Sequence, residues 1–410
     1  MGRGRHSFVP GYCRVPMPDD VKPLKICHVI TRLIVGGAQE NTLLSCEGQH
    51  QAGHDVTLIT GPTEGPEGSL MDRARGFGYR VEVVDAMRRN ILPRKDWATY
   101  RHLRQRFSEI RPDVVHTHSS KAGIIGRLAA WDEKVPHVVH TIHGLSFTAS
   151  NRALINAAYV RLEKLAATRC HTIVCVADAM ARDSLAKGIG RAEQYVTVYS
   201  GMDTDRFLNP PRPREDVRGE LGFEAGDVVV VTVARLFHKK GHEDLIAHAP
   251  RLCEKHPGLR FLWVGDGSLR GQFERELAEK GLLPRVKRVG LVDPERVPEL
   301  VAASDILAHP SRREGLARAL PQGQLAGLPV VTYDVDGNAE GLIPGETGYA
   351  VEPFDTDAFA AHLDALAGDP ALRHSMGTRG RAFAKARFDT SVMVKELERV
   401  YRRQPIGVPA

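Results

Sequence analysis

The segment from Ser311 to Glu340 places a carboxylate, a side-chain amide and several glycines close together in this 410-residue chain. Glu314 precedes a predicted short helix at 321–326, and Gln322 lies in the first turn of that helix. A helix N-terminus presents unpaired backbone N–H groups that can bind phosphate, while carboxylate and amide groups can hydrogen-bond hydroxyls. The segment therefore has the chemistry to hold a ligand with both phosphate and sugar groups. The alternative is an ordinary turn between a strand and a helix.

Two cations follow a predicted strand at 228–234. Arg235 stands at the strand end and Lys240 lies five residues further on, so both side chains can reach one diphosphate. Hydrogen bonds that involve charged groups are about twice as strong as those between neutral groups. Taken alone, this segment could equally be a solvated basic turn. Together with the Glu314 segment, it favours a phosphate site.

Paired glycines, Gly36 and Gly37, follow the first predicted strand at 25–31. Glycine allows a positive φ and a close approach of the backbone to a ligand. The spacing differs from the GxGxxG pattern of dinucleotide sites, which argues against a dehydrogenase. A tight turn that needs no ligand is the alternative at this position.

Three histidines lie at the ends of neighbouring predicted strands. His116 and His118 lie on one face of a strand end, and His143 follows the next strand. A single histidine is more often structural than catalytic, but three at successive strand ends indicate a site. A His-x-His pair is also typical of metal sites, yet no third ligand is evident, so we predict no metal. The six cysteines form no CxxC pair, which favours buried, reduced thiols.

Short apolar strands alternate with amphipathic helices in two successive series, which predicts two α/β doubly wound domains facing a cleft. The predicted boundary is the Pro-rich stretch at 210–213. We divide the chain into an N-terminal extension (1–24), a first domain (25–209), a second domain (210–390) and a last helix (391–410). The predicted strands are 25–31, 55–60, 80–84, 114–117, 137–141, 172–176, 195–199, 228–234, 260–265, 286–290, 305–308 and 329–333. The predicted helices after the one that ends near 52 are 70–76, 97–110, 151–169, 179–187, 242–255, 269–280, 321–326, 356–367, 371–386 and 391–403.

The composition is that of a globular protein, with 42% hydrophobic and 26% charged residues. The net charge of +6 favours anionic substrates or an anionic membrane face, but dense basic stripes with stacking aromatics are missing. We therefore predict no nucleic-acid partner. No apolar run approaches the ~18–20 residues of a membrane span, and the first residues do not form a secretory signal.

The Glu314 segment resembles the donor-site signature of the family-4 glycosyltransferases. That signature has a Glu, seven residues, a second Glu and then Gly-x-Pro-Val-Val, and this chain has Glu314, Gln322 and the run 327–331. Gln322 replaces the second acidic residue, which binds the nucleotide ribose in the family. Glutamine can still accept a hydrogen bond from a hydroxyl. Arg235 and Lys240 also match the residues that bind the donor diphosphate in the family.

The resemblance implies a GT-B fold and a retaining transfer of a hexose-type sugar from a nucleotide-diphosphate sugar to an acceptor hydroxyl. No cofactor is implied, and a UDP-sugar is preferred to a GDP-sugar. The implied catalytic residues are His143, Glu314, Arg235 and Lys240. The implied donor-binding residues are Gly36, Gly37, Arg235, Lys240, Gly265, Gly290, Glu314, Gly315, Leu316 and Gln322. The implied acceptor-side residues are His116, His118 and His143.

Family members of this kind build cell-surface polysaccharides or glycolipids on sugar or lipid-linked acceptors. We therefore expect a cytoplasmic protein that can contact the inner face of the cell membrane. The apolar stripe of helix 151–169 permits such contact, although a core position is the favoured interpretation. Two alternatives stay open: a nucleotide-sugar 2-epimerase of GT-B fold, and a catalytically inactive nucleotide-sugar-binding protein, which Gln322 would favour.

Overall fold

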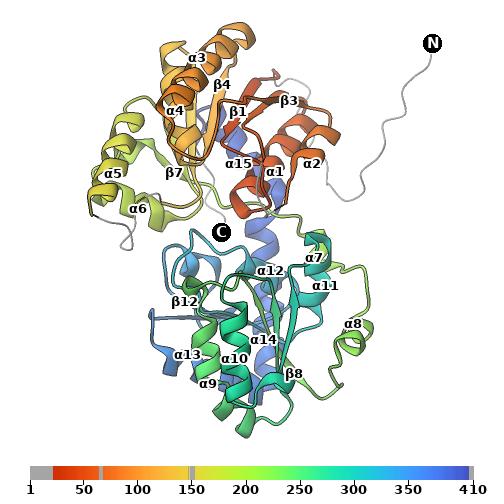
Figure 1. The fold of residues 1–410 in the computed structure, drawn as a ribbon. Helices are drawn as coiled ribbons and strands as arrows, with labels where there is room; N and C mark the ends of the chain where they lie inside the picture. The colour runs from red at the N-terminus through yellow and green to blue at the C-terminus, as the bar shows by residue number, and fades with distance from the viewer. Residues whose placement is uncertain (1–21, 64–67, 146, 148–152, 406–410) are drawn as a thin grey trace, which may run out of the picture.

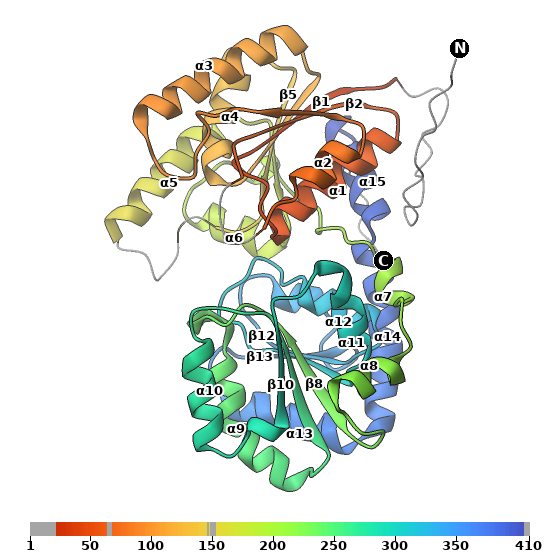
Figure 2. The same ribbon diagram turned by 45° about the vertical axis from the view of Figure 1, so that its right-hand side comes forward.

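Two lobes make up the molecule, each with a central β-sheet and helices on both faces (Figures 1 and 2). The computed structural model describes residues 22–63, 68–145, 147 and 153–405. The first sheet contains β1 (Lys25–Ile30), β2 (Asp55–Thr60), β3 (Arg80–Val83), β4 (Val114–His118), β5 (His137–Ile142), β6 (Thr172–Cys175) and β7 (Tyr195–Thr197). The second contains β8 (Val228–Val233), β9 (Leu259–Val264), β10 (Val286–Gly290), β11 (Ile306–His309), β12 (Val330–Tyr333) and β13 (Gly348–Val351).

Helices connect the strands of each sheet. The first lobe has α1 (Gly37–Gln51), α2 (Met71–Gly76), α3 (Pro93–Ile110), α4 (Ser120–Asp132), α5 (Ala153–Ala167) and α6 (Asp178–Ala186). The later helices are α7 (Asp205–Leu208), α8 (Arg214–Leu221), α9 (His242–Lys255), α10 (Arg270–Glu279), α11 (Val297–Ala302), α12 (Ala319–Leu325), α13 (Thr356–Gly368), α14 (Pro370–Phe388) and α15 (Thr390–Tyr401). Among the described residues, no helix combines the length and the apolar character needed to cross a membrane.

Both sheets are parallel and doubly wound, as predicted. The strand order is β3-β2-β1-β4-β5-β6-β7 in the first sheet and β10-β9-β8-β11-β12-β13 in the second. Central strands of such sheets are covered by helices on both faces, so they read as nearly continuous apolar runs. β8, with the sequence VVVVTV, is buried through its middle, and β1 is buried after its first residue. The five cysteines in the described residues are buried, with free thiols.

The sequence analysis missed several elements, α4 and α8 among them. α4 lies against the sheet through small residues, and a Cβ on Gly123 or Gly126 would meet His140 at 2.4 Å or Thr117 at 2.8 Å. This close approach explains why glycines stand inside a helix. The predicted strands and helices otherwise agree with the observed ones to within a few residues at their ends.

The last helix packs on the first lobe. α15 lies beside α1 in both ribbon views, while α14 lies along the second lobe (Figures 1 and 2). Met393, Val394 and Leu397 are buried in one hydrophobic cluster with β1. The chain crosses between the lobes near Met202 and again near Asp389. The two crossings lie side by side, since the backbone of Met202 is hydrogen-bonded to Phe388 and to Thr390. The first crossing precedes the predicted boundary at Pro210, since α7 already packs on α11 and α12.

The favoured interpretation, in which the apolar stripe of helix α5 lies in the core, is wrong. Leu154 is 85% exposed, and Ile155, Leu162 and Leu165 are each more than 40% exposed. The buried residues of this helix are Glu163, Ala166 and Ala167 instead. Helix α5 therefore presents an apolar face to the surroundings.

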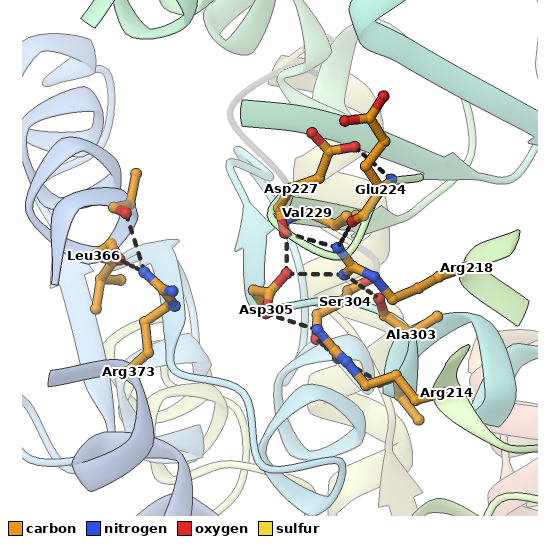
Figure 3. Close-up of polar contacts among 12 residues, drawn as sticks. Arg214, Arg218, Glu224, Asp227, Val229, Ala303, Ser304, Asp305, Leu366 and Arg373 are labelled. Atoms are coloured by element: carbon orange, nitrogen blue, oxygen red, sulfur yellow. Dashed lines mark hydrogen bonds and ion pairs between the residues drawn. The ribbon is translucent and has the colours of Figure 1, made fainter. Parts of the chain in front are cut away.

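A pair of arginines fastens α8 to the second sheet (Figure 3). The Arg218 guanidinium donates to the carbonyls of Ala303, Glu224 and Asp227 and contacts the Asp305 carboxylate. Asp305 also accepts from Arg214 and from the backbone N–H of Val229 in β8, at 2.7 and 2.8 Å. These bonds join the beginnings of β8 and β11 and so align the opposite ends of the two strands.

Replacing Arg218 with methionine should lower the free energy of unfolding by about 3 kcal/mol, because it removes the donor of three backbone carbonyls and one of the donors to the Asp305 carboxylate. Urea unfolding followed by the fluorescence of Trp263, which is 2% exposed in the second lobe, would measure this loss. Arg212→Met is the matched control. Arg212 pairs with Glu220 on the surface, where water and salt screen an ion pair and leave it little net effect on stability. Equal losses in the two variants would contradict the assigned role of Arg218.

Candidate active site

A pocket of about 400 Å³ lies between the two lobes, beyond the carboxyl ends of their strands. We call it the cleft pocket. Gly37 and His143 line it from the first lobe, and Lys240, Glu314 and Gln322 line it from the second. The carboxyl ends of parallel strands are where open α/β sheets bind ligands. The structure therefore brings together side chains that the sequence analysis selected separately.

A second pocket of about 310 Å³ shares lining residues with the first. We call it the adjoining pocket. Arg318, Gln322 and Glu40 border both. Arg235 and Gly265 line the adjoining pocket alone, together with apolar side chains of both lobes. The two pockets offer a charged compartment beside a more apolar one.

Glu314 is the electrostatic centre of the cleft pocket. Its carboxylate forms an ion pair with the Lys240 ammonium and lies 2.9 Å from the Nε2 atom of His309. Burial alone would raise the pKa of Glu314, but the His309 hydrogen bond and the nearby positive charges outweigh it and hold the pKa at about 2. Glu314 is therefore a carboxylate at neutral pH, able to accept hydrogen bonds from hydroxyl groups.

Three cations line the two pockets, and one of them, Lys240, contacts this carboxylate. Lys240 lies at the end of a short 3-10 helix after β8, and Arg235 is exposed, with its guanidinium 4.9 Å from the centre of the Phe237 ring. Arg318 reaches across to the first lobe, donating to the Gly201 carbonyl at 3.0 Å. It also forms a 3.2 Å ion pair with Glu40. This set of positive charges suits an anion with more than one charge.

The segment after Glu314 is arranged differently from the prediction. The helix α12 begins at Ala319 rather than at residue 321, and Gly315 and Leu316 line the cleft pocket in a bend of the preceding loop. A Cβ on Gly315 would lie 2.6 Å from the His143 carbonyl oxygen. Glycine is therefore needed here because this loop approaches the first lobe closely.

The glycines predicted to contact a ligand have three different roles. Gly36 is extended and Gly37 begins α1, so neither uses the positive φ that glycine allows. Gly37 makes room for Arg318, whose Cδ would lie 3.0 Å from a Cβ there. Gly265 does have a positive φ of 136°, and its backbone N–H donates to the carbonyl of Gly290 at 2.9 Å. This bond shapes the wall of the adjoining pocket.

Of the three predicted histidines, only His143 reaches the cleft. It is partly exposed and lines both the cleft pocket and a pocket of about 290 Å³ on its first-lobe side. His118 is fully buried behind it, with Nδ1 3.0 Å from the His143 Nε2 atom. His116 is also fully buried and bonds to Tyr401 and Thr141. His116 and His118, both expected on the acceptor side, have no exposed surface, so of these three histidines only His143 can contact a ligand in the cleft.

A third histidine joins this pair inside the first sheet. His28 lies opposite His116 in the register of β1 and β4, and ring nitrogens of His28, His116 and His118 lie within 4.8 Å of one another. Three imidazoles at this separation could in principle bind a metal ion. However, all six ring nitrogens already have hydrogen-bond partners, and none of these partners is a carboxylate. The arrangement fits a hydrogen-bonded cluster better than a metal site.

Sequence reasoning missed three residues of the site: His28, His309 and Arg318. His309 ends a buried strand five residues before Glu314, a position that marks it as a neighbour of that carboxylate. Arg318 lies inside the Glu314 segment itself. His28 has no such signal, because only the strand register brings it to His116 and His118.

Two known protein families match this chain, one in each lobe. The family described as Glycosyltransferase Family 4 matches residues 35–206, and the family described as Glycosyl transferases group 1 matches residues 213–383. The UDP-Gal:alpha-D-GlcNAc-diphosphoundecaprenol alpha-1,3-galactosyltransferase of Escherichia coli is 29% identical over 360 residues, which cover 85% of this chain and 89% of that protein. EpsD of Bacillus subtilis (strain 168) is 30% identical over 322 residues, which cover 77% and 83% of the two chains.

Among solved structures, HepE of Anabaena in complex with UDP superimposes with a TM-score of 0.80. The alignment covers 93% of this chain and 100% of that one, at 21% identity. A likeness at this identity bears on the fold alone. It confirms the predicted GT-B arrangement of two Rossmann-like domains.

The low pKa of Glu314 makes stability depend on pH. Because the folded-state pKa of about 2 lies below the ordinary value of 4.5, the ionised group stabilises the protein above pH 4.5, by about 3 kcal/mol. This contribution is lost as the pH falls from 4.5 towards 2. We expect the unfolding free energies of the wild type and Glu314→Gln to differ at pH 6 and to converge at lower pH. Urea unfolding at several pH values checks this, and parallel pH dependences would contradict it.

Proposed function

Because this chain belongs to the family 4 glycosyltransferases, we propose that it transfers a hexose-type sugar from a nucleotide-diphosphate sugar to an acceptor hydroxyl with retention of configuration. One observation carries the proposal. Lys240 and Arg318 line the cleft pocket with the ionised Glu314, and Arg235 lines the adjoining pocket, which shares Arg318. Cations beside a carboxylate suit a ligand whose diphosphate adjoins sugar hydroxyls.

The two pockets divide the donor between them. The cleft pocket takes the sugar and diphosphate, and the more apolar adjoining pocket takes the nucleoside, with Gln322 at their junction as the partner of a ribose hydroxyl. Before the donor binds, Lys240 is paired with Glu314 and Arg318 with Glu40. A diphosphate gives both cations a further anionic partner. The E. coli relative is named for UDP-Gal and the Anabaena structure contains UDP, which supports a UDP-sugar as the donor here.

The reaction proposed at this site exchanges one bond for another at the anomeric carbon. The acceptor oxygen forms a bond to that carbon while the bond to the diphosphate oxygen breaks, both on the same face of the sugar. The hydroxyl proton passes to the departing diphosphate oxygen. Arg235, Lys240 and Arg318 stabilise the negative charge that grows on the diphosphate as it leaves. Glu314 holds the sugar hydroxyls, and the acceptor enters from the side of His143.

The double variant Arg235→Ala with Lys240→Ala should lose turnover by about 10³-fold or more, because both removed cations stabilise the leaving group. Activity is measured as nucleotide release from UDP-sugars and GDP-sugars with and without sugar acceptors. The wild-type melting temperature should rise more with UDP than with GDP, since a ligand of the native state stabilises it by mass action. The double variant should lose most of this rise.

Lys280→Ala, which removes an exposed charge at the end of α10, is the control and should keep full turnover. Undiminished turnover in the double variant would reject the proposed role of the cations. Release of free nucleotide without any acceptor would favour the 2-epimerase. Nucleotide-sugar binding without transfer or release would identify an inactive binding protein.

We propose further that the acceptor is carried on a lipid and that the first lobe contacts an anionic membrane surface. The exposed α5 face lies next to a pocket of about 420 Å³ that is lined by Tyr159 and Leu162 and by the basic residues Arg89 and Lys121. Across this pocket, Ile91 is 71% exposed. Apolar side chains beside cations suit a surface of lipid tails and anionic headgroups. The diphosphoundecaprenol in the name of the E. coli relative supports this choice of acceptor.

Leu154→Glu with Leu162→Glu should reduce binding to phosphatidylglycerol vesicles by about tenfold or more, because two exposed leucines no longer enter the lipid. Co-sedimentation at low salt measures the bound fraction. Leu283→Glu, compared with Leu154→Glu alone, places one such charge at another exposed leucine, on the second lobe, and should bind like the wild type. A wild-type chain that stays in the supernatant would reject membrane contact without bearing on donor binding.

A further inference from the structure

A continuous line of hydrogen-bonded side chains joins the last helix to His143. Tyr401 in α15 contacts Gln49 in α1, Gln49 contacts His28, His28 contacts His118, and His118 contacts His143. The successive donor–acceptor distances are 2.9, 2.7, 2.9 and 3.0 Å. Each is a normal hydrogen-bond length. The cleft is therefore connected to the element that crosses between the lobes.

The imidazoles of this line are neutral. His28 and His118 are fully buried, and burial lowers the pKa of His28 to about 4 and that of His118 well below its usual range. Burial likewise lowers the pKa of His143 to about 3, with the charge of Arg318 as a further cause. At neutral pH each ring thus carries one proton, and donates from one nitrogen and accepts at the other.

The amide of Gln49 determines which nitrogen carries each proton. Its Oε1 atom faces His28 and can only accept, so His28 must donate from Nε2 and accept at Nδ1. His118 then donates from Nε2 to His28 and accepts at Nδ1, where the partner is Nε2 of His143. His143 is left with a proton on Nε2 and a lone pair on Nδ1. Among the described residues, this Nδ1 has no hydrogen-bond partner.

The Gln49 amide turns its oxygen towards His28 and its nitrogen towards Tyr401. The Nε2 group of Gln49 donates to the Tyr401 hydroxyl oxygen, which leaves the Tyr401 proton for Nδ1 of His116 at 2.6 Å. His116 then donates from Nε2 to the Thr141 hydroxyl at 2.6 Å. If the amide were rotated by half a turn, each proton on the line from Gln49 to His143, and on the line from Gln49 through Tyr401 to Thr141, would have to move to the other atom of its hydrogen bond. The orientation of the amide therefore decides which nitrogen of each ring carries the proton.

We propose that Gln49 and Tyr401 are positioning residues that hold His143 as its Nε2–H tautomer, so that Nδ1 accepts a hydrogen bond from a hydroxyl in the cleft pocket. The benefit to sugar transfer rests on the proposed function, whereas the tautomer does not. In the opposite tautomer, Nδ1 would be a donor and would repel the proton of a hydroxyl that needs an acceptor. A hydrogen-bond partner behind a catalytic imidazole acts in this way by fixing both tautomer and ring orientation.

The tautomer can be measured directly in the full chain. With ¹⁵N-labelled histidine, long-range proton–nitrogen spectra distinguish Nε2–H from Nδ1–H, and His143 is assigned by the loss of its signals in His143→Ala. We expect Nε2–H for His143 in the wild type. Gln49→Leu removes the acceptor and should give His143 a mixture of the two forms. Gln49→Glu still accepts from His28 and should restore Nε2–H, although it is the less favourable residue for a buried position.

Turnover should follow the tautomer. We expect Gln49→Leu to lower kcat by about tenfold with little change in the KM for the donor, and Gln49→Glu to recover most of it. Tyr401→Phe should resemble Gln49→Leu in direction. Glu398→Gln is the matched control, because it weakens another contact of α15, the 2.9 Å bond to His54, without touching this line. It should lower the melting temperature while leaving the His143 tautomer and kcat unchanged.

Two results would overturn the inference. One is Nδ1–H at His143 in the wild type, and the other is an identical His143 spectrum in the wild type, Gln49→Leu and Gln49→Glu. A chain with the expected tautomers but no transfer to any acceptor would instead reject the proposed function. It would leave the role of Gln49 in setting the tautomer supported.

Discussion

The parallel pairing of strands is the constraint on which the site depends. When all strands of a sheet run the same way, each ends at the same edge, and the helices that follow two central neighbours leave in opposite directions. Here those neighbours are β1 and β4 in one lobe and β8 and β11 in the other. Gly37 and Glu314 follow strands of these two pairs. Two such crevices placed face to face form one compartment from short segments that are far apart in the sequence.

Two of the three cations that line the pockets are paired before any ligand arrives. Lys240 is compensated by Glu314, and Arg318 by Glu40 on the opposite lobe. Uncompensated cations in a half-buried cleft would repel one another and cost folding free energy. The Arg318–Glu40 pair also joins the lobes, so an anion that binds Arg318 changes a contact between domains. Binding and the relative position of the lobes are therefore linked through one guanidinium.

Much of the fold was predictable because strands such as β8 are uniform apolar runs between clear turns. The elements that were missed depend on contacts between distant segments. Glycines inside α4 make room for His140 and Thr117, and α8 is held by arginine bonds to carbonyls rather than by an apolar stripe. The same distinction holds at the site. Arg235, Lys240 and Glu314 have a local spacing that indicates phosphate chemistry, whereas burial of His116 and the presence of His28 beside it follow from strand register alone.

The position of Tyr401 has a consequence for the order in which the protein is made. The first lobe contains His143, Gln49 and the whole first sheet, and all of these leave the ribosome early. Tyr401 is synthesised more than two hundred residues after His143. A nascent first lobe can therefore fold around its histidines before Tyr401 is present to complete the hydrogen bonds that hold their tautomers. Only a chain translated past Tyr401 has the residue that completes the line, so the site matures after the strands of both lobes have been synthesised.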